Sequence, residues 1–437
     1  MARKLHQFKA YSYNSFFILI LIVSIVLRLV ILYILPPGEN PDEPFIYERI
    51  WRFVTTGIDP SFHIQGSMYF PNNEYYYPPL YFLLASVAVK PVLFFSNNIS
   101  NINEAFLKSY VPLRIMSLLI SVGSLFFIWK ILVNFKISNY LKRSVFIFIA
   151  LLPTYVAFSV SPNHNVLLFF FISVFLYLLL SKKWVSTNLR QTSFLGIIVG
   201  LALLTKLEGV LLFISFFVFL YFQKVAKSLK HSLVFLFWVL IVAGWWFAIN
   251  IAKTGWFYNQ ELFSAALKGY TLPYSFPGYL SKLSDWTFET FLITYGSTNN
   301  VRLSSLGYML LYLFLIISFA GIIKTGLRRI RSLMKSQKSF YWTLIIFFVV
   351  NILIFLHVNL NLVFQPQGRY LFPSLLFLAI VITYGLSGWL KKNKLYLLPW
   401  SVFILFLFFN LWGLGCIYFV YRHISLLPPL LECVNYR

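Results

Sequence analysis

The feature that most constrains this chain is a series of apolar stretches of the length, about 20 residues, that an untilted helix needs to cross a membrane. They occupy residues 16–35, 113–133, 144–160, 163–181, 232–252, 306–325, 340–358, 370–389 and 395–420. Only 11% of the residues are charged, against about 25% in soluble domains, and the mean hydropathy is +0.78. We therefore expect an all-α polytopic membrane protein, with residues 1–437 forming one transmembrane domain and no separate soluble domain.

Two further apolar stretches have a less obvious relation to the membrane. Residues 192–222 are too long for one helix and are interrupted by the polar segment 205–208, so we expect two short helices with a turn at residues 206–209. Residues 78–95 are interpreted as a non-spanning helix on the outer surface. The prediction is then about eleven spans, with the N-terminus in the cytoplasm and the C-terminus outside.

The distribution of charge supports this topology. The net charge is +24, which would suggest a nucleic-acid partner in a soluble protein; in a membrane protein it reports which loops are cytoplasmic, and no nucleic-acid partner is expected. The topology places the basic clusters near 3–9, 136–143, 182–190, 224–230, 324–338 and 391–394 inside and every Asp and Glu outside. A spanning helix at 78–95 would instead turn the basic segment 324–338 outward.

Two large outer loops, residues 36–112 and 253–305, carry most of the polar residues. The first opens with a helix start, in which Asn40 suits the N-cap, Pro41 the first helical position and Glu43 the third, a capping box. Apolar residues then recur at helical spacing before Gly57: Ile46, Ile50, Phe53 and Val54. This pattern predicts an amphipathic helix lying on the outer membrane surface.

Asp42 and Glu43 are adjacent carboxylates in a chain that is poor in acid. Neighbouring residues of a helix point about 100° apart, so the two side chains cannot do the same work. One interpretation is that both are first-turn acids favoured by the helix dipole. The other is that one of them is the general base of an enzyme whose substrate is bound in the membrane.

Several motifs resemble those of a known superfamily. The Asp-Glu pair, the segment Tyr77-Pro78-Pro79-Leu80-Tyr81, an arginine opening the next span (Arg114) and the polar turn at 205–208 resemble the GT-C glycosyltransferases of the protein O-mannosyltransferase and aminoarabinose transferase type. PDEP at 41–44, ETFLITYGSTNN at 289–300 and QPQGRYLFP at 365–373 are similar to a broad microbial family of multipass membrane proteins placed in the same superfamily.

This resemblance implies a GT-C fold with a catalytic cavity on the outer face of the membrane. The donor would be a sugar on a polyprenyl phosphate lipid, transferred with inversion to a hydroxyl of a glycan, lipid or protein acceptor. By analogy with the family, Asp42 is the base that takes the acceptor's proton, and Glu43 is the second acid of the catalytic pair. The cytoplasmic membrane of a prokaryote is the expected location.

The leaving lipid phosphate needs cations, and the planar fork of arginine suits it. Arg369 is the first candidate, because it opens a span beside Gly368, where a close backbone approach is allowed. Arg114 and Lys206 are further candidates. The alternative for each is a basic side chain that reaches from the span to lipid headgroups.

Substrate contacts are expected from Gln367 and Tyr370, which flank Arg369, from Tyr77, and from His164. His164 lies in the outer loop SPNHN at 161–165, where GT-C enzymes often carry an acid. It could bind substrate or a metal, or it could be simply solvated.

No cofactor or metal site is predicted. A divalent metal is compatible with the reaction, but no Cys/His spacing supports one. Cys416 lies in the last span and Cys433 in the outer tail, and we expect no disulfide between them.

Two other functions share this architecture. A transporter or flippase of a lipid-linked saccharide is disfavoured because transporters commonly show repeated halves and midplane sites, whereas here the acids lie in an outer loop. The chain could also be a catalytically silent partner of another transferase. An enzyme would need Asp42 for transfer, and a silent partner would not.

Overall fold

The computed structural model describes residues 2–40, 42–55, 63–64, 75–76, 78–95, 102–180, 189–223, 228–254, 275–296, 301–361, 364–422 and 434–435. These residues are overwhelmingly helical, as expected. The helices up to the middle of the chain are α1 (Ala2–Ile34), α2 (Glu43–Thr55), α3 (Leu80–Phe95), α4 (Ile102–Asn134), α5 (Asn139–Leu151), α6 (Pro153–Phe158), α7 (His164–Leu180), α8 (Leu189–Leu203), η2 (Leu207–Gly209) and α9 (Val210–Gln223).

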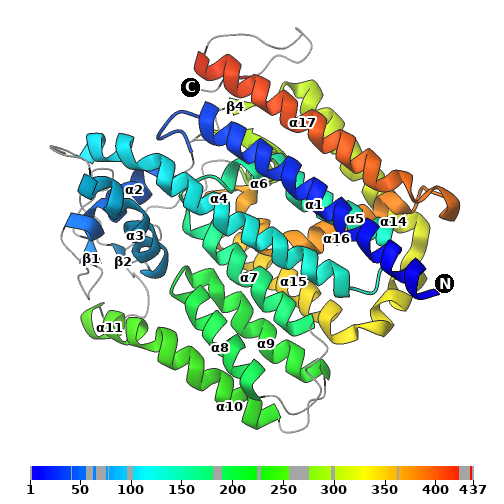
Figure 1. Cartoon of the computed structure of the whole chain (residues 1–437), viewed down its shortest axis with the longest axis horizontal. Helices are drawn as coiled ribbons and strands as arrows, with labels where there is room; N and C mark the ends of the chain where they lie inside the picture. Colours follow the sequence, from blue (N-terminus) through cyan, green and yellow to red (C-terminus); the bar gives the residue numbers. More distant parts are fainter. Residues whose placement is uncertain are drawn as a thin grey trace.

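The later helices are α10 (Ser228–Val239), η3 (Leu240–Gly244), α11 (Trp245–Thr254), α13 (Phe276–Leu292), α14 (Ser305–Ser336), α15 (Lys338–Asn361), η4 (Gly368–Ser374), α16 (Leu375–Ser387), η5 (Lys392–Lys394) and α17 (Leu397–Arg422). Long helices run side by side through the molecule, and α2 and α3 lie together at the end of the bundle where α4 begins (Figure 1). The N-terminus lies at the opposite end (Figure 1).

The lengths and compositions of the helices confirm a polytopic membrane protein. Seven helical segments within the described residues are long and apolar enough to cross a membrane, and four shorter apolar helices accompany them, including Leu80–Phe95. Large apolar side chains on several of these helices are exposed at the surface of the bundle, as lipid-facing residues would be. The total of eleven spans and their orientation stay predictions.

Two loops predicted to be cytoplasmic meet in space. The backbone N–H of Lys136 donates to Oε1 of Gln337 over 2.9 Å, and the Gln337 amide donates to the carbonyl of Asn134 over 3.3 Å. Phe135 packs beside them against Phe340. This contact joins the end of α4 to the junction of α14 and α15, so both basic loops lie on one side of the bundle.

The long apolar stretch at 192–222 folds as predicted. α8 ends at Leu203, and η2 and α9 follow after a turn. Gly209 is required at this turn, because a Cβ there would lie 2.7 Å from the backbone of Ala202. The N–H of Leu80 donates to the carbonyl of Leu204 over 2.9 Å, which ties the start of α3 to the same turn.

The start of the amphipathic helix α2 differs from the prediction. The helix begins at Glu43, after Asp42, whose φ of +62° lies in the left-handed region; Pro41 lies outside the described residues. The predicted apolar face is confirmed, because Ile46, Ile50 and Phe53 are buried and α2 packs against α3 and α4.

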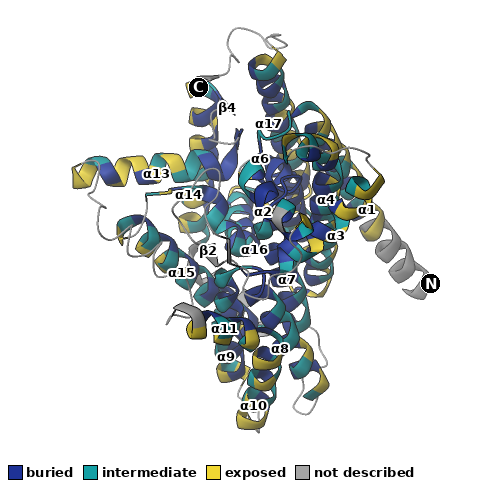
Figure 2. Ribbon diagram, turned by 90° about the vertical axis from the view of Figure 1, so that its left-hand side faces the viewer, coloured by how far each residue is buried: buried dark blue, intermediate teal, exposed yellow. Residues whose placement is uncertain are grey.

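Short strands occur at the loops. β1 (His63–Ile64) pairs with β2 (Tyr75–Tyr76), and β4 (Val301–Arg302) pairs with both β3 (Thr294–Tyr295) and β5 (Val434–Asn435), all antiparallel. The second sheet brings the end of the chain beside the segment that follows α13. That helix projects from the bundle with its N-terminal end exposed (Figure 2).

Cys416 near the end of α17 is disulfide-bonded. We expected no disulfide from the sequence, and the bond at Cys416 shows that this expectation is wrong.

Candidate active site

The loop that carries Asp42 is anchored by a buried ion pair. The Arg114 guanidinium donates from Nε to Oε1 of Glu43 and from Nη2 to Oε2, both over 2.8 Å. Neither side chain is exposed to solvent. The Glu43 carboxylate also accepts from the backbone N–H groups of Gly38 and Asn40, over 3.0 and 3.3 Å. Because α2 begins at Glu43, these contacts hold the loop before the helix and do not form the predicted capping box.

The rest of the Arg114 guanidinium binds the end of α1. It donates to the carbonyls of Leu32, Leu35 and Pro36 over 3.1, 2.6 and 2.7 Å. Neither Arg114 nor Glu43 lines either of the two cavities to which Arg369 belongs. This arrangement favours a positioning role for both residues over the predicted ones, a phosphate ligand for Arg114 and a catalytic acid for Glu43.

Asp42 meets Arg369, which lies more than 300 positions later in the sequence. Nη2 of Arg369 is 2.9 Å from Oδ2 of Asp42, and the Asp42 side chain is 44% exposed whereas that of Arg369 is 8% exposed. The amide of Asn163 donates to the same carboxylate oxygen over 3.3 Å. The predicted base and the first-choice phosphate ligand are therefore neighbours, with the carboxylate accessible and the cation largely enclosed.

Arg369 is held by contact between the motif at 365–373 and the motif at 289–300. It belongs to η4, whose first residue, Gly368, donates from its N–H to the Thr290 hydroxyl of α13 over 2.7 Å. A Cβ at Gly368 would lie 2.3 Å from the backbone nitrogen of Phe291. The close backbone approach expected at Gly368 is confirmed, and it packs residues 367–370 against residues 289–292.

Part of the Arg369 guanidinium remains available. Its Nε and Nη1 atoms are buried and have no hydrogen-bond partner among the described residues. Buried donors without a partner are costly. An anion entering beside Arg369 would accept from them without displacing Asp42 from Nη2.

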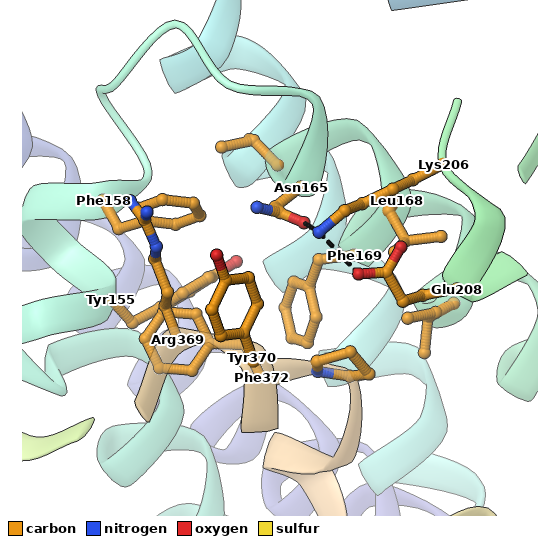
Figure 3. Close-up of a pocket in the computed structure, with 13 residues that line it drawn as sticks. Tyr155, Phe158, Asn165, Leu168, Phe169, Lys206, Glu208, Arg369, Tyr370 and Phe372 are labelled. Carbon is orange, nitrogen blue, oxygen red and sulfur yellow. Dashed lines mark hydrogen bonds and ion pairs between the residues drawn. The ribbon is translucent and has the colours of Figure 1, made fainter. Parts of the chain in front are cut away.

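Lys206 forms the second basic group of the site. Its Nζ lies 2.6 Å from Oε1 of Glu208 and donates to the amide oxygen of Asn165 over 2.8 Å, and these contacts are drawn in Figure 3. The ring of Tyr370 stands between the two cations, with its centroid 5.1 Å from the Lys206 ammonium and 5.7 Å from the Arg369 guanidinium carbon.

These side chains surround a cavity of about 400 Å³, open space at its mouth included. Arg369 and Lys206 stand on opposite sides of it (Figure 3). The wall is largely apolar and comes from α6, α7 and η4; it includes Tyr155, Phe158, Val166, Leu168, Phe169, Ile172, Phe372 and Pro373. The cavity, hereafter the basic cavity, thus combines two cations with an apolar lining.

The other residues predicted for the site are placed differently. Tyr370 lines the basic cavity and Gln367 a second one, which also touches Arg369. His164 lines neither cavity; its ring lies edge-on to Tyr81, with 6.4 Å between centroids. Tyr77 lies outside the described residues.

The structure adds two residues on either side of His164. Asn163 contacts Asp42 and Asn165 contacts Lys206, so the two asparagines of the SPNHN loop reach the charged groups of the site directly. The signal in the sequence was the polar loop itself. Nowhere in the described part of the chain do three His, Cys, Asp or Glu side chains gather as a metal site would require.

Comparisons with known proteins support the fold. Residues 91–247, fewer than half of the chain, match the family of dolichyl-phosphate-mannose-protein mannosyltransferases. No curated protein sequence matches the chain.

Solved structures resemble it over almost its whole length. ArnT from Cupriavidus metallidurans in the apo state has a TM-score of 0.54 at 13% identity, covering 94% of this chain and 66% of ArnT. The same protein bound to undecaprenyl phosphate gives 0.52 at 15% identity, with the same coverages. The archaeal oligosaccharyltransferase AglB from Archaeoglobus fulgidus, in complex with an inhibitory peptide and a dolichol-phosphate, gives 0.52 at 14% identity, covering 96% of this chain and 57% of AglB.

The chain thus spans less than two thirds of the length of these neighbours, and identities this low show a common fold. That fold is the GT-C fold of membrane glycosyltransferases. The fold class expected from the sequence is confirmed, and so is the resemblance to this superfamily.

Proposed function

We propose that this protein is a glycosyltransferase that moves a sugar from a polyprenyl-phosphate donor to an acceptor hydroxyl at the outer membrane face, with inversion. The observation that carries the proposal is the Asp42–Arg369 ion pair, whose arginine lines the basic cavity. It places an accessible carboxylate next to an enclosed guanidinium with unused donors. A base for the acceptor and a cation for the leaving phosphate are thus adjacent.

The reaction follows from these positions. The acceptor oxygen attacks the anomeric carbon as its proton passes to the Asp42 carboxylate, and the bond from that carbon to the phosphate oxygen breaks. The electron pair leaves with the polyprenyl phosphate. Arg369 and Lys206 stabilise its developing charge, and the apolar wall of the basic cavity suits the first isoprene units.

Inversion fits the availability of carboxylates. Glu43 is fully buried against Arg114 and cannot act as a nucleophile. Glu208 is paired with Lys206, on the opposite side of the cavity from Arg369 (Figure 3). A single displacement with Asp42 as base needs no further carboxylate.

The outward orientation rests on three features. All acids lie in loops placed outside by the charge distribution. Two basic loops meet at the side of the bundle predicted to be cytoplasmic. Cys416, near the end of the last helix, is disulfide-bonded, and disulfides persist in oxidising compartments.

The first test measures binding of a polyprenyl phosphate. Undecaprenyl phosphate and dolichyl phosphate are titrated into the purified protein, and binding is followed by native mass spectrometry. Arg369→Lys replaces a bidentate fork with a point charge and should weaken binding about tenfold, and Arg369→Ala should weaken it further, since hydrogen bonds to charged groups are worth about 1.5–3 kcal/mol. Unchanged affinity in a folded Arg369→Ala protein would remove Arg369 from the phosphate site.

The second test asks whether Asp42 is needed for transfer. Membranes of the producing cells supply radiolabelled lipid-linked sugars and acceptors to purified protein. Asp42→Asn keeps the shape of the side chain but cannot take a proton, so transfer should fall by about two orders of magnitude or more. Asp285→Asn, on α13 and outside both cavities, is the matched control and should stay near wild type. Full transfer by Asp42→Asn would favour a transporter or a silent partner.

A further inference from the structure

A second cavity adjoins the basic cavity and shares Arg369 and Phe158 with it. Its volume is about 380 Å³, open space at its mouth included. Its other lining residues are Leu35, Asn40, Thr154, Ala157, Thr290, Thr294, Tyr295, Gly296 and Gln367. We call it the neutral cavity.

The linings of the two cavities differ in charge and in polarity. The basic cavity contains Arg369, Lys206 and Glu208 within a largely apolar wall. Among the described residues that line the neutral cavity, Arg369 is the only charged one, and the remaining polar groups are hydroxyls and amides. A charged lipid headgroup therefore suits the first cavity, and an uncharged ligand rich in hydrogen-bonding groups suits the second.

The neutral cavity also has an unused acceptor. Oε1 of Gln367 is buried and has no hydrogen-bond partner among the described residues. A buried amide oxygen left unpaired costs about 1–3 kcal/mol, so a ligand hydroxyl that donates to it would be bound favourably. Gln367 is two residues from Arg369, so such a ligand would lie close to the guanidinium.

The loop of the proposed base belongs to the same cavity. Leu35 and Asn40, from the segment that leads to Asp42, line the neutral cavity, whereas no described residue of this segment lines the basic one. A ligand in the neutral cavity is therefore on the side from which Asp42 is presented. A hydroxyl of that ligand can approach Asp42 while the donor phosphate occupies the other side of Arg369.

We infer that the neutral cavity is the acceptor site and that the acceptor is an uncharged saccharide. This inference rests on the proposed function and specifies its acceptor. Sugar hydroxyls match the threonine hydroxyls and the Gln367 amide, and the rings of Phe158 and Tyr295 supply the apolar surface that a pyranose face covers. The same chemistry would fit the sugar of the donor, and the experiment separates these two sources.

The experiment uses full-length protein in detergent and methyl α-mannopyranoside as the probe, with binding followed by saturation-transfer difference NMR. Gln367→Leu removes the unused acceptor and should weaken probe binding about tenfold, the usual scale for one buried hydrogen bond. Ala157→Leu fills the cavity and should abolish binding. Gln337→Leu makes the same change as the first variant at the other end of the bundle and should leave binding unchanged.

A second arm identifies the source of the sugar. The probe is added to protein saturated with undecaprenyl phosphate, and then to protein saturated with polyprenyl-phosphate mannose. An acceptor site should bind the probe in both cases. Loss of probe binding with the sugar-bearing lipid alone would assign the cavity to the sugar of the donor and overturn the acceptor assignment.

The remaining outcomes separate this inference from the proposed function. If undecaprenyl phosphate binds and no probe signal arises in wild type, the saccharide site is wrong and the proposed transferase stands. Probe binding that Gln367→Leu and Ala157→Leu leave unchanged would also overturn the site. If neither ligand binds to folded protein, the inference and the proposed function both fail.

Discussion

Glu43 and Arg114 form an ion pair in which both side chains are fully buried and two parallel hydrogen bonds of 2.8 Å join the carboxylate to the guanidinium. Because Glu43 directly follows Asp42 and Arg114 also binds three carbonyls at the end of α1, the pair fixes the backbone that presents the proposed base. Tyr421 of α17 holds the same loop through a 2.8 Å hydrogen bond to Glu39.

Removal of one partner of this pair should destabilise the fold. Arg114→Ala leaves a buried carboxylate without its cation, which typically costs about 3–5 kcal/mol. We expect a large drop in melting temperature in detergent and little folded protein. Arg114→Lys should recover only part of the loss, because an ammonium cannot form the parallel bonds.

The matched control is the exposed pair between Lys108 and Glu104 on α4, with 2.7 Å between Nζ and Oε1. Lys108→Ala breaks a pair of this kind at the surface, which is worth about 0–1 kcal/mol, so its melting temperature should stay near wild type. A melting temperature of Arg114→Ala as high as that of Lys108→Ala would contradict the anchoring role.

The backbone of Asp42 makes a separate prediction. Its φ of +62° is unusual for a residue with a side chain, although Asp and Asn tolerate it better than others. Both Asp42→Asn and Asp42→Val lose the ion pair with Arg369, but only Asp42→Val, with a branched Cβ, also disfavours the left-handed backbone, so it should be less stable than Asp42→Asn by about 1–2 kcal/mol or more. Equal melting temperatures for the two variants would argue against the left-handed conformation.

Local patterns predicted the parts of the fold that depend on neighbouring residues. The break between α8 and α9 follows from a polar, glycine-containing segment inside an apolar stretch, and the buried face of α2 follows from the spacing of Ile46, Ile50 and Phe53. The tight contact at Gly368 was also foreseen, because only glycine allows backbones to approach so closely. The first two features have their physical cause within a few residues, whereas for Gly368 the sequence predicts only that a close approach is allowed, since the partner segment at Thr290 lies 78 positions away.

The features that could not be foreseen depend on contacts between distant residues. Arg114 and Glu43 are 71 positions apart, and an arginine at the start of a span looks the same whether it binds phosphate, lipid headgroups or a buried acid. The positive φ of Asp42 occurs in a loop held by contacts at Glu43, at Glu39 and at the end of α1. The neutral cavity likewise joins four separate segments of the chain.

Lys206 is partly neutralised by Glu208, with 2.6 Å between Nζ and Oε1. Glu208→Gln removes that negative charge from the basic cavity, so the affinity for undecaprenyl phosphate should rise several-fold, with the largest gain at low salt. Lys206→Met should lower the affinity. Native mass spectrometry with the titrated lipid measures both, and tighter binding by Lys206→Met than by wild type would exclude Lys206 from the phosphate site.

The membrane topology predicts a pattern of chemical labelling. Thr55 at the end of α2 and Lys108 near the start of α4 are exposed and flank α3, and Lys136 and Lys392 are exposed in loops predicted to be cytoplasmic. If α3 does not cross the membrane, Thr55→Cys and Lys108→Cys should both react with an impermeant maleimide added to intact cells. Lys136→Cys and Lys392→Cys should react only after permeabilisation, because the positive-inside rule places these loops in the cytoplasm.

The unmodified protein is the background control for this labelling experiment, since Cys416 is disulfide-bonded. Labelling of Lys108→Cys without Thr55→Cys would show that α3 spans the membrane, and labelling of Lys136→Cys in intact cells would reverse the orientation of the bundle and place the proposed active site inside the cell.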